Sequence, residues 1–334
     1  MAVAVTAAAA LLAGCGQGGG QDSGQGAPAP AETAAAPSAA SAFPVTVAGK
    51  EGTATIPAQP ERVVTVGLQR DTDIALALGV TPVGMAKAAS FPSGVAPWVE
   101  PVLAGEQPEL VDMTSGQPPL ESIAALDPDV ILAVDDYALA EHFEQLSQIA
   151  PTVSYAEAQN TDTWQESTQR IATALGVEDK AAGVIADAEA AVRDAAAANP
   201  GLAGRTFSFS VVYSGTVYTV LGSDAAATVL TQLGMELAPA VAALPESTTK
   251  GRAQVSEEQI STLDADVVMV SYATPADQAA LEANPLFQRL SAVSSGAYFP
   301  LDFNVGVALA FPSPLATPYA VEGIVPPLKQ ALKL

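Results

Sequence analysis

A segment of fourteen residues occurs twice in this chain, and this repeat limits the folds that the chain can adopt. ESIAALDPDVILAV at 121–134 returns as EQISTLDADVVMVS at 258–271, with six identical positions. Each copy predicts a short amphipathic helix, a polar turn and a buried apolar strand. Two copies of such a unit predict two similar α/β lobes.

A second pair of segments supports this interpretation. ALALGV at 75–80 and LTQLGM at 230–235 are both typical of a helix that ends at a glycine, and each follows a predicted strand, Val63–Val66 and Phe207–Val212. Alternating strands and helices favour mostly parallel sheets with helices on both faces. The predicted fold class is therefore α/β, with two similar Rossmann-like lobes and a ligand cleft between them.

The predicted order of segments along the chain places one long helix between the two lobes. Glu178–Ala198 is alanine-rich and would run about 30 Å as a helix, enough to cross from one lobe to the other. Lobes joined in this way are expected to move little relative to each other. The predicted segments are a signal peptide at 1–14, a tether at 15–42, an N-terminal lobe at 43–160, a helical region at 161–199 and a C-terminal lobe at 200–334.

The N-terminus predicts export and attachment to a membrane. Ala2–Leu12 is too short an apolar run to span a bilayer but suits a secretory signal. The following Leu-Ala-Gly-Cys resembles the lipobox of bacterial lipoproteins, in which the cysteine, here Cys15, receives the lipid. No Lys or Arg precedes the run, so the true translation start is left open. Residues 16–41 are rich in Gly, Gln, Ala, Pro and Ser and predict a flexible tether.

Composition excludes several classes of function. The formal net charge of -23 argues against nucleic acid as a partner, because phosphate binding needs a basic face. His142 is the only histidine and Cys15 the only cysteine, and neither a Gly-x-Ser-x-Gly motif nor a histidine cluster with metal-ligand spacing occurs. We therefore expect no enzyme, with a secreted carboxylate-dependent hydrolase as the alternative. His142 falls in an amphipathic helix at 139–146, which predicts a surface or packing role.

Five short motifs carry a family resemblance. They are PERVV at 60–64, ALGVTPVG at 77–84, LESI with LDPDVI at 120–131, NPLF at 284–287 and FPSP at 311–314. In order and spacing they resemble the substrate-binding lipoproteins of ABC importers for ferric siderophores and cobalamin. The resemblance implies a monomeric extracytoplasmic protein that captures a ferric siderophore and delivers it to a membrane permease. The iron would be held by the siderophore, so neither a cofactor nor a metal ligand is expected from the protein.

The resemblance also implies two permease-docking residues, Glu121 and Glu258, which are equivalent positions of the repeat. A glutamate in the first turn of a helix also has a simpler explanation, because it complements the helix dipole. Glu257 directly precedes Glu258, so which of the two carboxylates docks stays open.

The ligand contacts are predicted among donors and aromatic side chains in the loops after strands. These candidates are Arg70, Trp98, Tyr137, Tyr213, Tyr218, Lys250 and Arg252. Hydroxamate binders of the family carry an arginine shortly before the Leu-Glu motif, but residues 112–117 here contain no basic residue. Because the chain offers few cations for a trianionic catecholate, a ferric hydroxamate is favoured. Cobalamin and haem remain the alternatives, with tyrosine as the axial ligand for haem.

Overall fold

The structure is a computed structural model that describes residues 43–158 and 161–334. The predicted signal peptide, the lipidation of Cys15 and the tether lie outside these residues. The described chain begins with an antiparallel hairpin of β1 (Val45–Ala48) and β2 (Thr53–Ile56), as the alternating pattern around Gly49 and Gly52 predicts.

The N-terminal lobe is built on a five-stranded sheet in the order β5-β4-β3-β6-β7, in which every pairing is parallel. Its central strands are buried on both faces because helices cover the sheet. Its strands are β3 (Val63–Thr65), β4 (Gly84–Ala86), β5 (Glu109–Val111), β6 (Val130–Ala133) and β7 (Thr152–Ser154). Its helices are α1 (Arg70–Ala77), α2 (Glu100–Leu103), α3 (Leu120–Ala125) and α4 (Leu139–Ser147).

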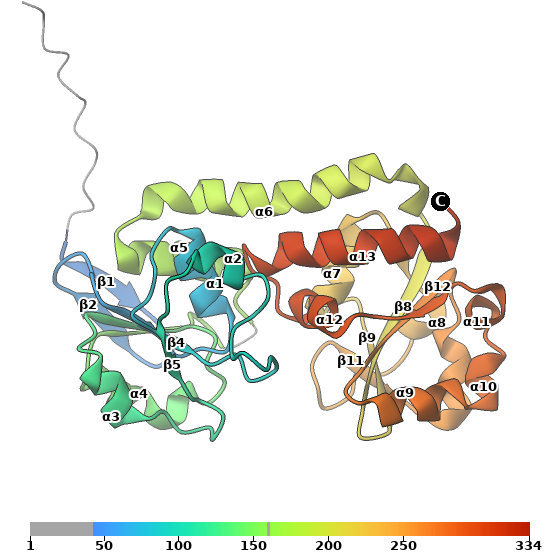
Figure 1. Ribbon diagram of the computed structural model, residues 1–334, viewed down its shortest axis with the longest axis horizontal. Helices are drawn as coiled ribbons and strands as arrows, with labels where there is room; N and C mark the ends of the chain where they lie inside the picture. The colour runs from blue at the N-terminus through green and yellow to red at the C-terminus, as the bar shows by residue number, and fades with distance from the viewer. Residues whose placement is uncertain (1–42, 159–160) are drawn as a thin grey trace, which may run out of the picture. The chain divides into compact units, whose positions relative to one another are not determined.

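Two helices follow this lobe within the predicted helical region, and the second covers the range that the sequence predicts. α5 (Trp164–Leu175) begins with a capping box between Thr163 and Glu166 and ends at Gly176, whose φ of 68° suits a residue without a side chain. α6 (Glu178–Ala198) then runs from the first lobe to the second, as Figure 1 shows, and a short 3-10 turn, η1 (Pro200–Leu202), ends it.

The C-terminal lobe has a six-stranded sheet in the order β11-β9-β8-β12-β13, with β10 also paired to β8. Parallel pairings join β8 to β10 and β12, and β12 to β13, whereas β9 is antiparallel to both neighbours. The strands are β8 (Thr206–Tyr213), β9 (Thr216–Val220), β10 (Glu236–Leu237), β11 (Arg252–Val255), β12 (Val267–Tyr272) and β13 (Tyr298–Pro300). The helices are α7 (Ala225–Gln232), α8 (Pro239–Ala242), η2 (Glu257–Leu263), α9 (Pro275–Glu282), α10 (Pro285–Gln288), α11 (Ser291–Ser295), α12 (Phe303–Ala310) and α13 (Ala316–Leu332).

The two-lobed α/β fold is thus confirmed, and the sequence repeat has a structural counterpart. β3-α1-β4 corresponds to β8-α7-β10, and α3-β6 corresponds to η2-β12, with the β8–β9 hairpin added in the second lobe. Even the repeated aspartate makes the same contact. Asp129 Oδ2 accepts the backbone N–H of Arg62 at 2.9 Å, and Asp266 Oδ2 accepts that of Thr206 at 2.8 Å. In both lobes this aspartate ties the repeat to the start of the first strand.

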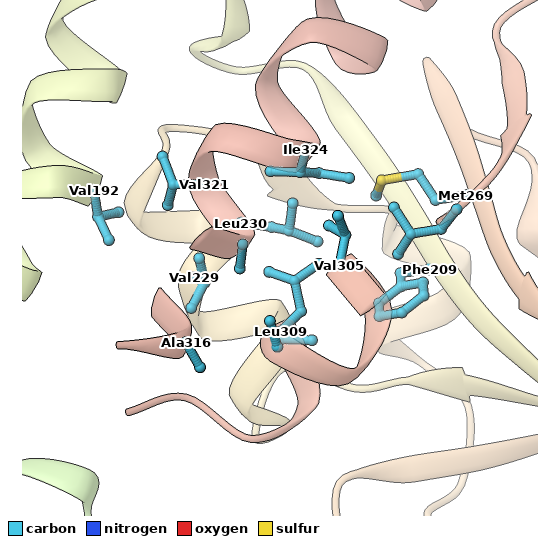
Figure 2. Close-up of a cluster of buried hydrophobic side chains, with 14 of the residues drawn as sticks. Val192, Phe209, Val229, Leu230, Met269, Val305, Leu309, Ala316, Val321 and Ile324 are labelled. Atoms are coloured by element: carbon cyan, nitrogen blue, oxygen red, sulfur yellow. The ribbon is translucent and has the colours of Figure 1, made fainter. Parts of the chain in front are cut away.

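The largest apolar cluster draws on both lobes and on α6. Figure 2 shows its C-terminal part, where Val192 of α6 lies beside Val321 of α13, and Val305 of α12 lies near Phe209 of β8. Trp98 and Leu103 of the first lobe belong to the same cluster. The lobes are therefore joined by apolar packing as well as by α6. Within residues 43–158 and 161–334, no helix is both long and apolar enough to cross a membrane.

Candidate ligand-binding site

The carboxyl ends of the parallel strands in the first lobe form a small hollow. Ligands of open α/β sheets bind at this edge, where loops replace the strands. The hollow is lined by residues that follow β3, β5 and β6: Val66, Leu68, Met113, Gly116, Asp136, Tyr137 and Ala138. One predicted contact residue, Tyr137, belongs to this lining.

Tyr137 is held in place by its buried neighbours. Its side chain is 61% exposed, which is unusual for a large ring in a folded protein. Asp136 accepts the backbone N–H of Ala138 through Oδ1 at 2.9 Å, and its Oδ2 lies 2.5 Å from His142 Nε2. His142 is 1% exposed. The single histidine is therefore a packing residue that fixes the turn carrying Tyr137.

Arg70 lies at the same edge but is buried and paired. Its Nη1 is 3.7 Å from Asp135 Oδ1, and its backbone N–H donates to Asp135 Oδ2 at 3.4 Å. Burial, followed by the nearby charge of Asp135, raises the pKa of Asp71 well above its usual range. Lys87, after β4, is likewise 3.5 Å from Asp112. These cations are partly neutralised by carboxylates, so this edge offers little free positive charge.

Trp98 packs at the junction between the lobes. The residue is 5% exposed, its Nε1–H donates to Asp73 at 2.8 Å, and its ring centroid is 5.3 Å from that of Tyr319 in α13. In this conformation the indole ring is engaged in contacts within the protein. A ligand contact at Trp98 stays a prediction.

The second lobe presents exposed aromatic side chains at the corresponding edge. Tyr213 is the last residue of β8 and is 63% exposed, and Phe303, the first residue of α12 after β13, is 42% exposed. Sequence reasoning missed Phe303. The sequence signal for this residue was a helix N-terminus directly after a strand, with Asp302 as its cap. The Phe303 ring lies 6.3 Å from Phe91 of the first lobe, so the two edges meet there.

Of the other predicted contacts in the second lobe, Tyr218 is a diagonal neighbour of Tyr213 on the same face of the β8–β9 hairpin, whereas the two cations lie away from it. Tyr218 is half-buried within β9, between β8 and β11. Arg252 pairs with Asp224 at 3.2 Å and stands opposite Val220, whereas Tyr213 stands opposite Thr216. Four residues of strand separate these levels, or about 13 Å. Lys250 is exposed just before β11. The structure therefore does not bring the two cations together with Tyr213.

The predicted docking residues are exposed at equivalent places in the two lobes. Glu121 is the second residue of α3, and Glu258 is the second residue of η2. Glu257, also exposed, opens η2. Across the two described stretches of chain, no group of three or more histidine, cysteine or acidic side chains is arranged to hold a metal ion.

The chain belongs to the family of periplasmic binding proteins, whose sequence pattern matches residues 64–305. This confirms the resemblance carried by the short motifs. The Fe(3+)-citrate-binding protein YfmC of Bacillus subtilis is 28% identical over 260 residues, 76% of each chain. A periplasmic solute binding protein of Mycobacterium smegmatis superposes with a TM-score of 0.74 at 28% identity, covering 86% of this chain and 98% of its own. The iron uptake protein PiaA of Streptococcus pneumoniae in complex with ferrichrome gives 0.70 at 26% identity, with the same coverage.

Proposed function

We propose that this chain is the extracytoplasmic substrate-binding component of an ABC importer and that it captures a ferric siderophore of the hydroxamate type. It would deliver this ligand to a membrane permease, working as a monomer anchored through a lipid on Cys15. One observation carries the proposal. Exposed tyrosines, Tyr137 and Tyr213, stand at the carboxyl ends of β6 and β8 in the two lobes of a protein whose relatives include iron-chelate binders.

The chemistry of these edges fits a ligand of low charge. Tyrosine offers a hydrogen-bond donor to carbonyl oxygens and a ring face to an organic skeleton. Arg70 and Lys87 have aspartate partners at 3.7 and 3.5 Å, so they do not form the free cationic cluster that a trianionic catecholate needs. A ferric hydroxamate, which presents oxygens with little net charge, suits this lining better.

The proposal is tested by calorimetric titration of the folded protein with ferrichrome, ferrioxamine, a ferric catecholate, ferric citrate, cobalamin and haemin. We expect the hydroxamates to bind most tightly and to be recovered unchanged. If cobalamin or haemin binds most tightly, the natural ligand is not a siderophore but one of these alternative ligands of the same importer class. Chemical conversion of the bound ligand would favour the hydrolase alternative, and no binding by any compound would refute the proposal.

Removal of either exposed tyrosine should weaken binding without unfolding the protein. We expect Tyr137→Ala and Tyr213→Ala each to raise the dissociation constant about tenfold, which corresponds to about 1.4 kcal/mol. Thermal stability should change little, because both side chains are exposed. Leu286→Ala, which removes an exposed apolar side chain on α10, is the matched control. Unchanged affinity in both tyrosine variants would place the ligand elsewhere.

Docking to the permease is proposed through Glu121 and Glu258, whose exposure and equivalent positions support the role. Reversal of both charges, Glu121→Lys with Glu258→Lys, should abolish uptake of radiolabelled ligand by cells while the dissociation constant stays the same. Glu257→Lys combined with Glu121→Lys is the control that distinguishes the two neighbouring carboxylates. A loss of ligand affinity in the double variant would show instead that these residues belong to the ligand site or the fold.

A further inference from the structure

A single buried carboxylate joins the two lobes through hydrogen bonds. Asp73 of α1 is 1% exposed, and its Oδ2 accepts both Trp98 Nε1–H at 2.8 Å and Ser313 Oγ–H at 2.5 Å. Trp98 belongs to the first lobe, whereas Ser313 precedes α13 in the second, 240 residues along the chain from Asp73. Ser313 is fully buried, and its Oγ also accepts the backbone N–H of Ala316, the first residue of α13.

Aromatic rings surround this contact on both sides of the junction. Trp98 packs against Tyr319 of α13 with the centroids 5.3 Å apart, and Phe91 meets Phe303 edge to face at 6.3 Å. Phe303 is one of the exposed rings at the candidate ligand site. The position of this ring relative to Tyr137 therefore depends on how the second lobe sits on the first.

The apolar contacts alone do not define that position. The hydrophobic effect has no preferred direction, so it holds the lobes together without itself selecting one orientation. A hydrogen bond, by contrast, is directional, because it weakens steeply when the donor and the acceptor are misaligned. Asp73 gathers two such bonds, one from each lobe, on one oxygen.

We propose that Asp73 is a positioning residue of the ligand site. By binding both Ser313 and Trp98, it fixes where α13 and α12 pack on the first lobe. It thereby also fixes the position of Phe303 relative to Tyr137. α6 limits the distance between the lobes, while Asp73 sets how the lobes face each other. The effect on the ligand rests on the proposed function. The effect on the arrangement of the lobes does not.

The arrangement of the lobes is measured first, without ligand. The experiment uses the full chain with Cys15→Ser as its background. Spin labels are placed at Ala124 and Ala280, which are exposed on α3 and α9. The distance between the two labels is recorded by pulsed electron paramagnetic resonance. We expect a narrow distribution that Asp73→Ala and Ser313→Ala broaden or shift. Asp73→Asn should restore it, because the amide oxygen can accept both donors.

The matched control is Asp264→Ala. Asp264 accepts backbone N–H groups of Ser291 and Ala292 within the second lobe, so its loss should lower stability without moving the lobes. A distribution in Asp73→Ala and Ser313→Ala that matches wild type would overturn the proposal. Should Asp73→Ala fail to fold, Ser313→Ala, which deletes a single hydroxyl, decides alone.

Ligand affinity is the second measurement. The dissociation constant for ferrichrome should rise about tenfold in Asp73→Ala and Ser313→Ala and return toward the wild-type value in Asp73→Asn. A disturbed lobe distribution with unchanged affinity would refute the positioning role. If the wild-type protein binds none of the tested ligands, the proposed function fails, whereas the distance measurement still decides whether Asp73 sets the arrangement of the lobes.

Discussion

Because the carboxyl group of Asp73 is buried, its ionisation should make the free energy of unfolding depend on pH. The pKa of Asp73 is raised to about 7, chiefly by burial and with a contribution from the charge of Asp135, although the hydrogen bonds from Ser313 and Trp98 and the charge of Arg70 act to lower it. In the unfolded chain the same carboxyl titrates near 3.8. The folded protein therefore binds this proton more tightly than the unfolded chain, and the resulting stabilisation is lost as the pH rises through 7.

Asp73→Asn should remove this pH dependence. Relative to the variant, we expect wild type to lose about 3 kcal/mol of its free energy of unfolding between pH 5 and pH 8, because each pH unit below the folded pKa contributes about 1.4 kcal/mol. Urea unfolding of both proteins across this range measures the difference. A constant difference between them would show that Asp73 is ionised throughout.

Individual site residues differed in how far the sequence could place them. Tyr137 and Tyr213 follow strands that their apolar runs predicted, and both lie exposed at the carboxyl edges. Arg70 also lies at such an edge, but its side chain is 6% exposed and paired with Asp135. Position along the chain predicts which loop holds a residue. Burial and partners depend on segments far away in sequence.

Among the elements, α12 and α13 cross closely at a glycine. A Cβ built at Gly323 would collide with Cγ2 of Val305. Valine is stiff at χ1 in a helix, so this neighbour cannot easily move aside. By contrast, a Cβ at Gly183, exposed in α6, would meet nothing within 4 Å.

These two glycines should respond in opposite ways to alanine. We expect Gly323→Ala to lower the free energy of unfolding by about 1–3 kcal/mol through overpacking. Gly183→Ala should raise it by about 0.5–1 kcal/mol, because alanine is the better helix former. Denaturant unfolding curves of the two variants provide the comparison. A stabilised Gly323→Ala protein would show that the helices can separate without cost.

Elements with a clear period or cap were predictable, and others were not. The capping box of α5 and the repeat before β6 and β12 are signals formed by residues close together in the sequence. α12 was missed because FNVGVALA is apolar nearly all round and shows no helical period. The second copy of the repeat also differs, since its helix is a 3-10 turn.

For the molecule as a whole, one apolar cluster links the lobes. It contains Trp98 and Leu103 from the first lobe, Val192 from α6, and Val305 and Ile324 from the second. Opening either lobe alone would expose part of this cluster to water, which costs about 25 cal/mol for each Å² of apolar surface. The lobes should therefore unfold together.

Urea unfolding should show one transition. Tryptophan fluorescence, which reports on Trp98 at the junction and Trp164 at the start of α5, should follow the same curve as far-UV circular dichroism. Substitution of Leu103, which is 7% exposed in the shared cluster, by alanine should shift both curves equally. Two separate transitions would mean that the lobes are independent folding units.

The sequence by itself determined the two α/β lobes, the helix between them and the equivalence of Glu121 and Glu258, because repeats, apolar periods and helix ends are local signals. The tertiary structure alone decided that Arg70 is buried against Asp135, that Phe303 reaches the ligand edge, and that Asp73 binds Ser313 from the other lobe. Those contacts join residues up to 240 positions apart. They exist only once the packing of the lobes has brought their partners together and has excluded water.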